Sequence, residues 1–138
     1  YHKNTPIVAA AGSGEIDAGF VNHYYLHKFI AEEGESFRAR NFFLPGGGPG
    51  SMVMVAGVGR LKSAENVENA QKFIDFLLSP VAQQYFAGQT YEYPLVDGVK
   101  IHRELTPLVE LNSVDIDPTD LSDLRGTVEL LTDIGALE

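Results

Sequence analysis

The chain has 138 residues, of which 44% are hydrophobic, and ten basic against nineteen acidic residues give a net charge of −9. This size and composition fit one globular domain with a real core. The negative charge argues against a nucleic-acid partner, because phosphate backbones are bound through basic patches. The lack of cysteine excludes disulfides and thiolate metal sites. No apolar run approaches the ~18 residues needed to span a bilayer.

The first predicted helix begins near Asn4, with Thr5 as the N-cap and Pro6 as the first helical residue. It is expected to end at Gly12 or Gly14. If Asn4 lies just before this helix, its side chain and the free N–H groups of the first turn can face a bound anion. A solvent-exposed turn residue is the alternative interpretation of Asn4.

A second helix is predicted to follow a strand with almost no loop between them. The apolar run at residues 18–21 indicates a short buried strand, and Leu26, Phe29 and Ile30 recur at the spacing of an amphipathic helix. Gly34 is a standard signal for the C-terminal end of that helix.

Asn22 lies at the junction and is a preferred N-cap, and Tyr24 and Tyr25 follow within the first helical turn. A phenol has a pKa near ~10 in water, but a bound multivalent cation makes the deprotonated form the stable one. Phenolate oxygen is a hard donor that suits Fe(III), and free helix N–H groups beside it can hold an anion. The alternative is packing, since Tyr25 lies four residues before Phe29 and can simply fill the core.

Strands and helices alternate through the rest of the chain, which favours an α/β fold with a mixed or mostly parallel sheet. The further predicted elements are strands at 41–44 and 52–58, the second of them buried, a helix at 67–78 broken by Ser79-Pro80, a short helix ending at Gly88, an extended segment at 90–96 and a last helix at 121–134.

Three other patterns are interpreted as structural. The loop at 45–51 lacks the Gly-Lys-Ser/Thr ending of nucleotide sites. His102 and Glu104 have no accompanying nucleophile, which argues against an enzyme. The acidic run at 115–120 lacks the glycine and the closing glutamate of a calcium loop, so a solvated turn entering a helix is expected there.

Four stretches, in this order, resemble the ferric-ion-binding proteins of bacterial ABC importers, which are class II periplasmic substrate-binding proteins. The resemblance covers essentially the whole chain. The stretches are Gly14-Glu15-Ile16-Asp17-Ala18-Gly19-Phe20-Val21-Asn22-His23-Tyr24-Tyr25, Pro49-Gly50-Ser51 with a strand containing Gly57, Ala70-Gln71-Lys72-Phe73-Ile74-Asp75-Phe76-Leu77, and Tyr93-Pro94-Leu95.

This resemblance implies a periplasmic-binding-protein-like (type II) fold, with the chain as the second half of a two-lobe protein whose mixed, mostly parallel sheet is flanked by helices. It divides the chain into a ligand-binding lobe segment with the tandem tyrosines at 1–52, a hinge strand and helices of the other lobe at 53–95, and a return segment with the C-terminal helix at 96–138.

By the same resemblance, Tyr24 and Tyr25 ligate Fe(III) through phenolate oxygens, and Asn4 and Asn22 contact a synergistic anion, phosphate or carbonate. Many family members add a histidine and a carboxylate from the first half, and none of the four histidines here matches that ligand. The chain alone is therefore expected to bind iron incompletely.

The implied function is solute binding for an ABC importer, with delivery of Fe(III) to a membrane permease from a periplasmic or lipid-anchored extracytoplasmic location. The implied partners are the permease, and either the missing N-terminal half or further copies of the chain, which would cover exposed apolar helix faces. The alternative is the same fold binding a small organic or phosphorylated solute without metal.

Overall fold

The computed structural model describes residues 1–44 and 46–137. None of the helices in these ranges combines the length and apolarity that crossing a membrane requires. The helical elements are α1 (Asn4–Ser13), α2 (Tyr24–Glu33), a 3₁₀ turn (Pro49–Ser51), α3 (Val67–Leu77), α4 (Pro80–Tyr85), a π-helical turn (Phe86–Thr90), two further 3₁₀ turns (Leu108–Glu110 and Pro118–Ser122) and α5 (Leu124–Asp133).

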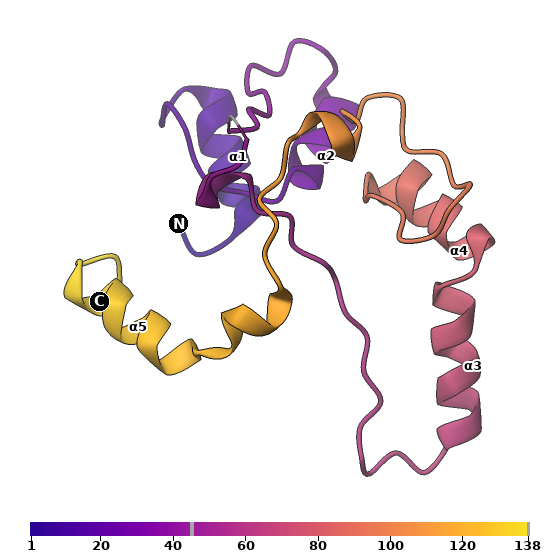
Figure 1. The fold of residues 1–138 in the computed structure, drawn as a ribbon. Helices are drawn as coiled ribbons and strands as arrows, with labels where there is room; N and C mark the ends of the chain where they lie inside the picture. Colours follow the sequence, from indigo (N-terminus) through magenta and orange to yellow (C-terminus); the bar gives the residue numbers. More distant parts are fainter. Residues whose placement is uncertain (45, 138) are drawn as a thin grey trace.

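The helices form separate groups joined by long extended connections (Figure 1). α1 packs against α2, and α3 leads into α4 at Ser79, whose hydroxyl oxygen accepts the N–H of Ala82 and caps α4. An extended arm runs from the first group out to α3, and residues 91–107, which follow the π-helical turn and are called the return segment from here on, come back to lie beside α2 (Figure 1). α5 lies apart from both groups. The two groups of helices are therefore connected mainly where the return segment contacts α2.

The main core lies between α1 and α2. Val8 on α1, Leu26 on α2 and Phe37 just after α2 are the buried residues of this cluster. The Phe29 ring stacks on the Phe37 ring with centroids 5.1 Å apart. α2 ends at Gly34, whose φ of 79° is readily adopted only by glycine, so the predicted end of this helix is confirmed.

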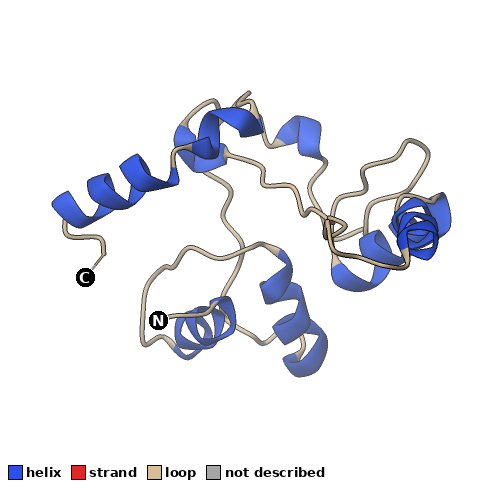
Figure 2. Ribbon diagram, turned by 90° about the horizontal axis from the view of Figure 1, so that it is seen from below, coloured by secondary structure: helices blue, strands red, loops and turns tan. Residues whose placement is uncertain are grey.

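The predicted mixed sheet is not found, because the described residues contain no strand (Figure 2). The segments expected as strands run as extended chain, and the expected burial of two of them is wrong: Phe20 is 90% exposed and Met54 is 66% exposed. A strand needs a neighbouring strand to satisfy its backbone N–H and C=O groups. No other described segment pairs with residues 18–21 or 52–58, so neither forms a ladder.

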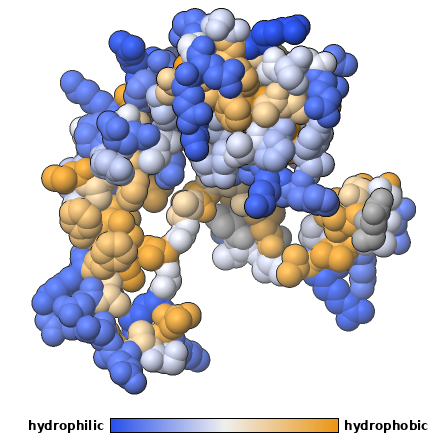
Figure 3. All heavy atoms as spheres, turned by 180° about the vertical axis from the view of Figure 1, so that it is seen from behind, coloured by the Kyte–Doolittle hydropathy of each residue, from blue (hydrophilic) through white to orange (hydrophobic). Residues whose placement is uncertain are grey.

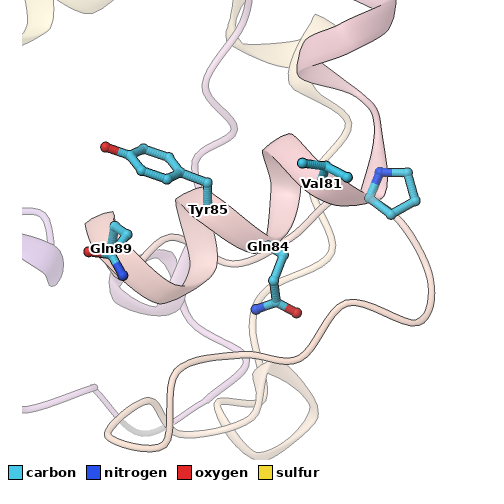
Figure 4. Close-up of a pocket in the computed structure, with 5 residues that line it drawn as sticks. Val81, Gln84, Tyr85 and Gln89 are labelled. Atoms are coloured by element: carbon cyan, nitrogen blue, oxygen red, sulfur yellow. The ribbon is translucent and has the colours of Figure 1, made fainter.

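Large apolar side chains are exposed on α3 and α4. The helix predicted at 67–78 is present, but Phe73 is 59% and Phe76 is 53% exposed on its apolar face. Figure 3 shows apolar side chains gathered over this column of the molecule. On α4, Val81 and Tyr85 line a shallow depression together with Gln84 and Gln89 (Figure 4). This surface has the composition of an interior but faces solvent.

The acidic run before α5 forms caps, as predicted for a turn entering a helix. The Asp117 carboxylate accepts the N–H of Thr119 at 2.9 Å and its hydroxyl at 2.7 Å, which holds the pKa of Asp117 below its ordinary value. Asp123 accepts the N–H of Gly126 at 2.9 Å and so caps α5. Asp117 thus caps the 3₁₀ turn at Pro118–Ser122 and Asp123 caps α5.

Gly12 offers a direct test of the α1–α2 core. A Cβ added to Gly12 would overlap the ring of Phe37, whereas a Cβ on Gly59 would meet nothing within 4 Å. We expect Gly12→Ala to lower the free energy of unfolding by about 1–3 kcal/mol, the usual cost of overpacking a core. Urea unfolding of this variant and of Gly59→Ala measures the difference. Equal stability of the two variants would contradict the packing described above.

Candidate metal-binding site at the start of α2

Tyr24 and Tyr25 are the first two residues of α2. Both side chains are half-buried, and their ring centroids lie 4.9 Å apart with an angle of 30° between the ring planes. Adjacent helical residues point about 100° apart, yet here both rings lie on the same side of the helix start. The structure therefore brings the two predicted phenols together, at the end of the helix where the backbone dipole is positive.

Asn22 joins this pair to α1. Its backbone N–H donates to Asn4 Oδ1 at 3.0 Å, and its side-chain amide donates to the Tyr24 hydroxyl oxygen at 3.1 Å. Its carbonyl accepts the N–H of Tyr25 at 3.2 Å. All four predicted site residues are thus connected through Asn22.

The predicted N-caps of both helices are wrong, that of α2 by one residue and that of α1 by two, since the N-cap of α1 is Lys3 and not Thr5. The N-cap of α2 is His23 and not Asn22, and Asn4 is the first residue of α1 and not the residue before it. The Asn22 side chain does not cap the helix because its amide is directed at the Tyr24 hydroxyl.

His23 is a residue of this site that the sequence did not identify. Its ring Nε2 lies 2.7 Å from the carbonyl oxygen of Tyr91, and its own carbonyl accepts the side-chain amide of Asn41 at 2.9 Å. The ring meets Tyr24 edge to face at 5.5 Å and Tyr93 at 5.2 Å between centroids. His23 therefore ties the tyrosine pair to two segments that are distant in sequence.

One turn further along α2, His27 is buried against the return segment. Its ring stacks on the ring of Tyr91, with centroids 4.5 Å apart and planes 9° from parallel. Nδ1 lies 3.3 Å from Glu104 Oε2 but makes no hydrogen bond. Burial lowers the pKa of His27, and this outweighs the opposing effect of the nearby Glu104 carboxylate. Protonation of the His27 ring is therefore disfavoured in the folded chain.

The described residues contain no group of three or more histidine, cysteine, aspartate or glutamate side chains that could hold a metal ion. The donors that the structure does gather at the start of α2 are the two phenol oxygens, with an amide donor beside one of them. Phenolate oxygen is a hard donor, so these two phenols suit a hard, highly charged ion better than the softer ions that prefer imidazole or thiolate ligands.

The sequence of this chain matches, over residues 3–116, the profile of a family described as bacterial extracellular solute-binding proteins. The chain belongs to this family. The similarity to ferric-ion-binding members, first indicated by the tandem tyrosines, is confirmed by individual relatives.

Among these relatives, the major ferric iron-binding protein of Neisseria meningitidis serogroup B is 34% identical over 136 residues, and iron uptake protein A1 of Synechocystis is 37% identical over 127 residues. These alignments cover 98% and 88% of this chain, but 41% and 34% of the relatives. The chain thus spans about two fifths or less of the length of the solute-binding proteins that it matches.

The fold is similar to that of a solved member of the family. The crystal structure of iron-bound HitA from Pseudomonas aeruginosa superposes with a TM-score of 0.89 at 32% identity, covering 98% of this chain and 44% of the HitA chain. The periplasmic-binding-protein-like architecture is therefore confirmed at the level of the backbone path. The open layout of the helices therefore matches the backbone path of less than half of the HitA chain.

The lowered pKa of His27 makes the stability of the fold depend on pH. Because the pKa of His27 in the folded chain lies below its value in the unfolded chain, protonation favours unfolding. This contribution is complete above pH ~6.5 and is lost as the pH falls below it. We expect the thermal unfolding midpoint to drop between pH 7.5 and 5.5, and to drop less in His27→Gln. A midpoint that rises on acidification would show that the Glu104 carboxylate dominates instead.

Proposed function

We propose that the chain forms the Fe(III)-binding part of a solute-binding protein that serves an ABC importer and delivers iron to a membrane permease. The observation that carries this proposal is the side-by-side pair of Tyr24 and Tyr25 phenols at the start of α2, with the Asn22 amide directed at one of them. The relatives named as ferric iron-binding proteins, and the likeness to iron-bound HitA, support it.

In this proposal Tyr24 and Tyr25 lose their protons and bind Fe(III) as phenolates. Two anionic oxygens neutralise much of the charge of the ion, and a bound trivalent cation makes deprotonation favourable. The protein acts by binding and release, without chemical turnover. Differential contacts with the ion in open and closed arrangements of two lobes would hold it and then let it go.

A synergistic anion, phosphate or carbonate, completes the metal shell in this proposal. The Asn22 side chain is exposed beside the phenols, and Asn4 lies next to it at the start of α1. The free N–H groups of two helix starts, α1 and α2, are thus close to the same place, where they favour a negative ligand. Asn4 and Asn22 would orient this anion between the helices.

We further propose that the extended segments and exposed apolar faces are covered by polypeptide beyond the described residues. The chain covers 44% of the HitA chain, and large side chains such as Phe73, Phe76 and Val81 face solvent. The complementary half of a two-lobe protein would pair with the extended segments and form the mixed, mostly parallel sheet. Further copies of this chain are the other candidate partner. The location would be periplasmic, either soluble or lipid-anchored.

The proposed iron site can be tested by absorbance. With Fe(III) supplied as citrate and with phosphate or bicarbonate present, we expect a visible phenolate-to-iron charge-transfer band. Tyr24→Phe and Tyr25→Phe should each weaken this band and lower the iron affinity by about 100-fold, the upper end of what losing even an outer-shell partner costs. Titration followed by absorbance, with citrate as competitor, measures both quantities.

Tyr85→Phe is the matched control, because Tyr85 lies on α4 and is 62% exposed. It should leave the band unchanged. The titration is run on the chain and on any longer form of the protein that contains it. No band in either would overturn the iron proposal and favour a small organic or phosphorylated solute.

A substitution of Asn4 distinguishes contact with the proposed anion from a purely structural contact with the Asn22 backbone. Asn4→Asp keeps a side-chain oxygen that can accept the N–H of Asn22, but it places a negative charge beside the proposed anion. If Asn4 contacts the anion, Asn4→Asp should lower the iron affinity about tenfold or more in phosphate, as Asn22→Ala should by removing one hydrogen bond to a charged group. Iron affinity that is unchanged in Asn4→Asp would show that Asn4 only holds the backbone of Asn22.

A further inference from the structure

The backbone just after α4 has an unusual conformation. Residues Phe86–Thr90 form a π-helical turn, and Tyr91 follows with φ 60° and ψ 29°, in the left-handed region that side chains other than glycine rarely adopt. Both features cost conformational energy and are often found at functional sites. We therefore ask which groups this turn brings into contact with the rest of the chain.

The turn directs two groups of one residue at α2, along which the return segment lies (Figure 1). The carbonyl of Tyr91 lies 2.7 Å from His23 Nε2, and the ring of Tyr91 stacks on the ring of His27 at 4.5 Å. His23 and His27 are four residues apart, so they lie on the same face of the helix start, one turn from each other. On its other side the Tyr91 ring contacts the ring of His102 at 4.5 Å.

The hydrogen bond to Tyr91 also fixes the proton on the His23 ring. A carbonyl oxygen only accepts, so Nε2 must be the protonated nitrogen that donates. The same ring meets the Tyr24 ring edge to face, at 5.5 Å and 77°. Because the hydrogen bond to Tyr91 fixes the His23 ring, that ring limits the positions that the neighbouring Tyr24 ring can take.

We infer that His23 is a positioning residue for Tyr24, anchored to the strained backbone of Tyr91 by its Nε2–H. This inference rests on the proposed role of Tyr24 as an iron ligand. Metal-binding side chains must be held within about 0.5 Å of their working geometry by neighbours whose own conformations are fixed. Asn22 holds the hydroxyl end of Tyr24, and His23 holds its ring, so both ends of the ligand are restrained.

Two substitutions distinguish the effect of the His23 ring from the effect of its N–H donor. His23→Gln keeps an amide N–H that can occupy the place of Nε2–H, and His23→Phe keeps an aromatic ring without a donor. We expect His23→Phe to lower the Fe(III) affinity about tenfold, the value of one hydrogen bond, and to shift the maximum of the charge-transfer band. His23→Gln keeps the donor but loses the ring that meets Tyr24, so it should recover part of the lost affinity. His2→Phe is the control, because His2 is an exposed histidine at the start of the chain.

A merely structural role would lower the thermal stability of His23→Phe but leave the band maximum and the iron affinity of the folded protein unchanged. That result would overturn the inference. So would equal loss in His23→Gln and His23→Phe, because the donor would then be irrelevant.

A readout without iron keeps this test separate from that of iron binding. In iron-free protein, the hydrogen-bonded Nε2–H should give a slowly exchanging downfield proton resonance that disappears in His23→Gln and persists in His2→Phe. If this resonance is present and no variant or parent shows a charge-transfer band, the proposed function fails while the His23–Tyr91 contact stands. If the band is present and the resonance is absent, the positioning role of His23 fails alone.

Discussion

The geometry of the candidate site depends on hydrogen bonds that hold the start of α2 from three distant segments. Asn4 accepts the backbone N–H of Asn22, Asn41 donates to the carbonyl of His23, and the carbonyl of Tyr91 accepts from the His23 ring. These partners come from α1, from the chain after α2 and from the return segment. Because a helix start has free backbone groups and frays easily, such outside contacts decide where its side chains lie. The position of the tyrosine pair is therefore a tertiary property.

The extended segments and the exposed apolar helix faces have one physical cause. Each of them needs a partner surface, either a neighbouring strand or an apolar layer, and the described residues do not supply it. The backbone nevertheless follows that of HitA with a TM-score of 0.89. This agreement shows that the separated helices and extended connections follow the backbone path of a solved solute-binding protein, over 44% of the HitA chain.

The need for a partner surface also explains which elements could be predicted from the sequence and which could not. The end of α2 at Gly34 and the helix of residues 67–77 were predictable, since glycine and apolar periodicity act locally. The sheet was not found, because a strand exists only with its partner. The pairing of the tyrosines with Asn4 and Asn22 followed from resemblance to a family. The role of His23 could not be predicted. Its partner Tyr91 is 68 residues away, and the contact is made to the backbone carbonyl, a group that every residue has and that no sequence pattern marks.

The contact between α2 and the return segment bears on how a tightly held ion can be released. A ligand shifts a conformational equilibrium only by the difference between its affinities for the two states. If Tyr24 binds iron as proposed, an arrangement that keeps His23 on the Tyr91 carbonyl binds the ion more tightly than one that separates them. The backbone of Tyr91 is strained, so its contacts with His23 and His27 must outweigh that strain to persist. Separating His23 from the Tyr91 carbonyl would then relieve this strain and release one restraint on Tyr24, while the backbone hydrogen bonds of α2 stay in place.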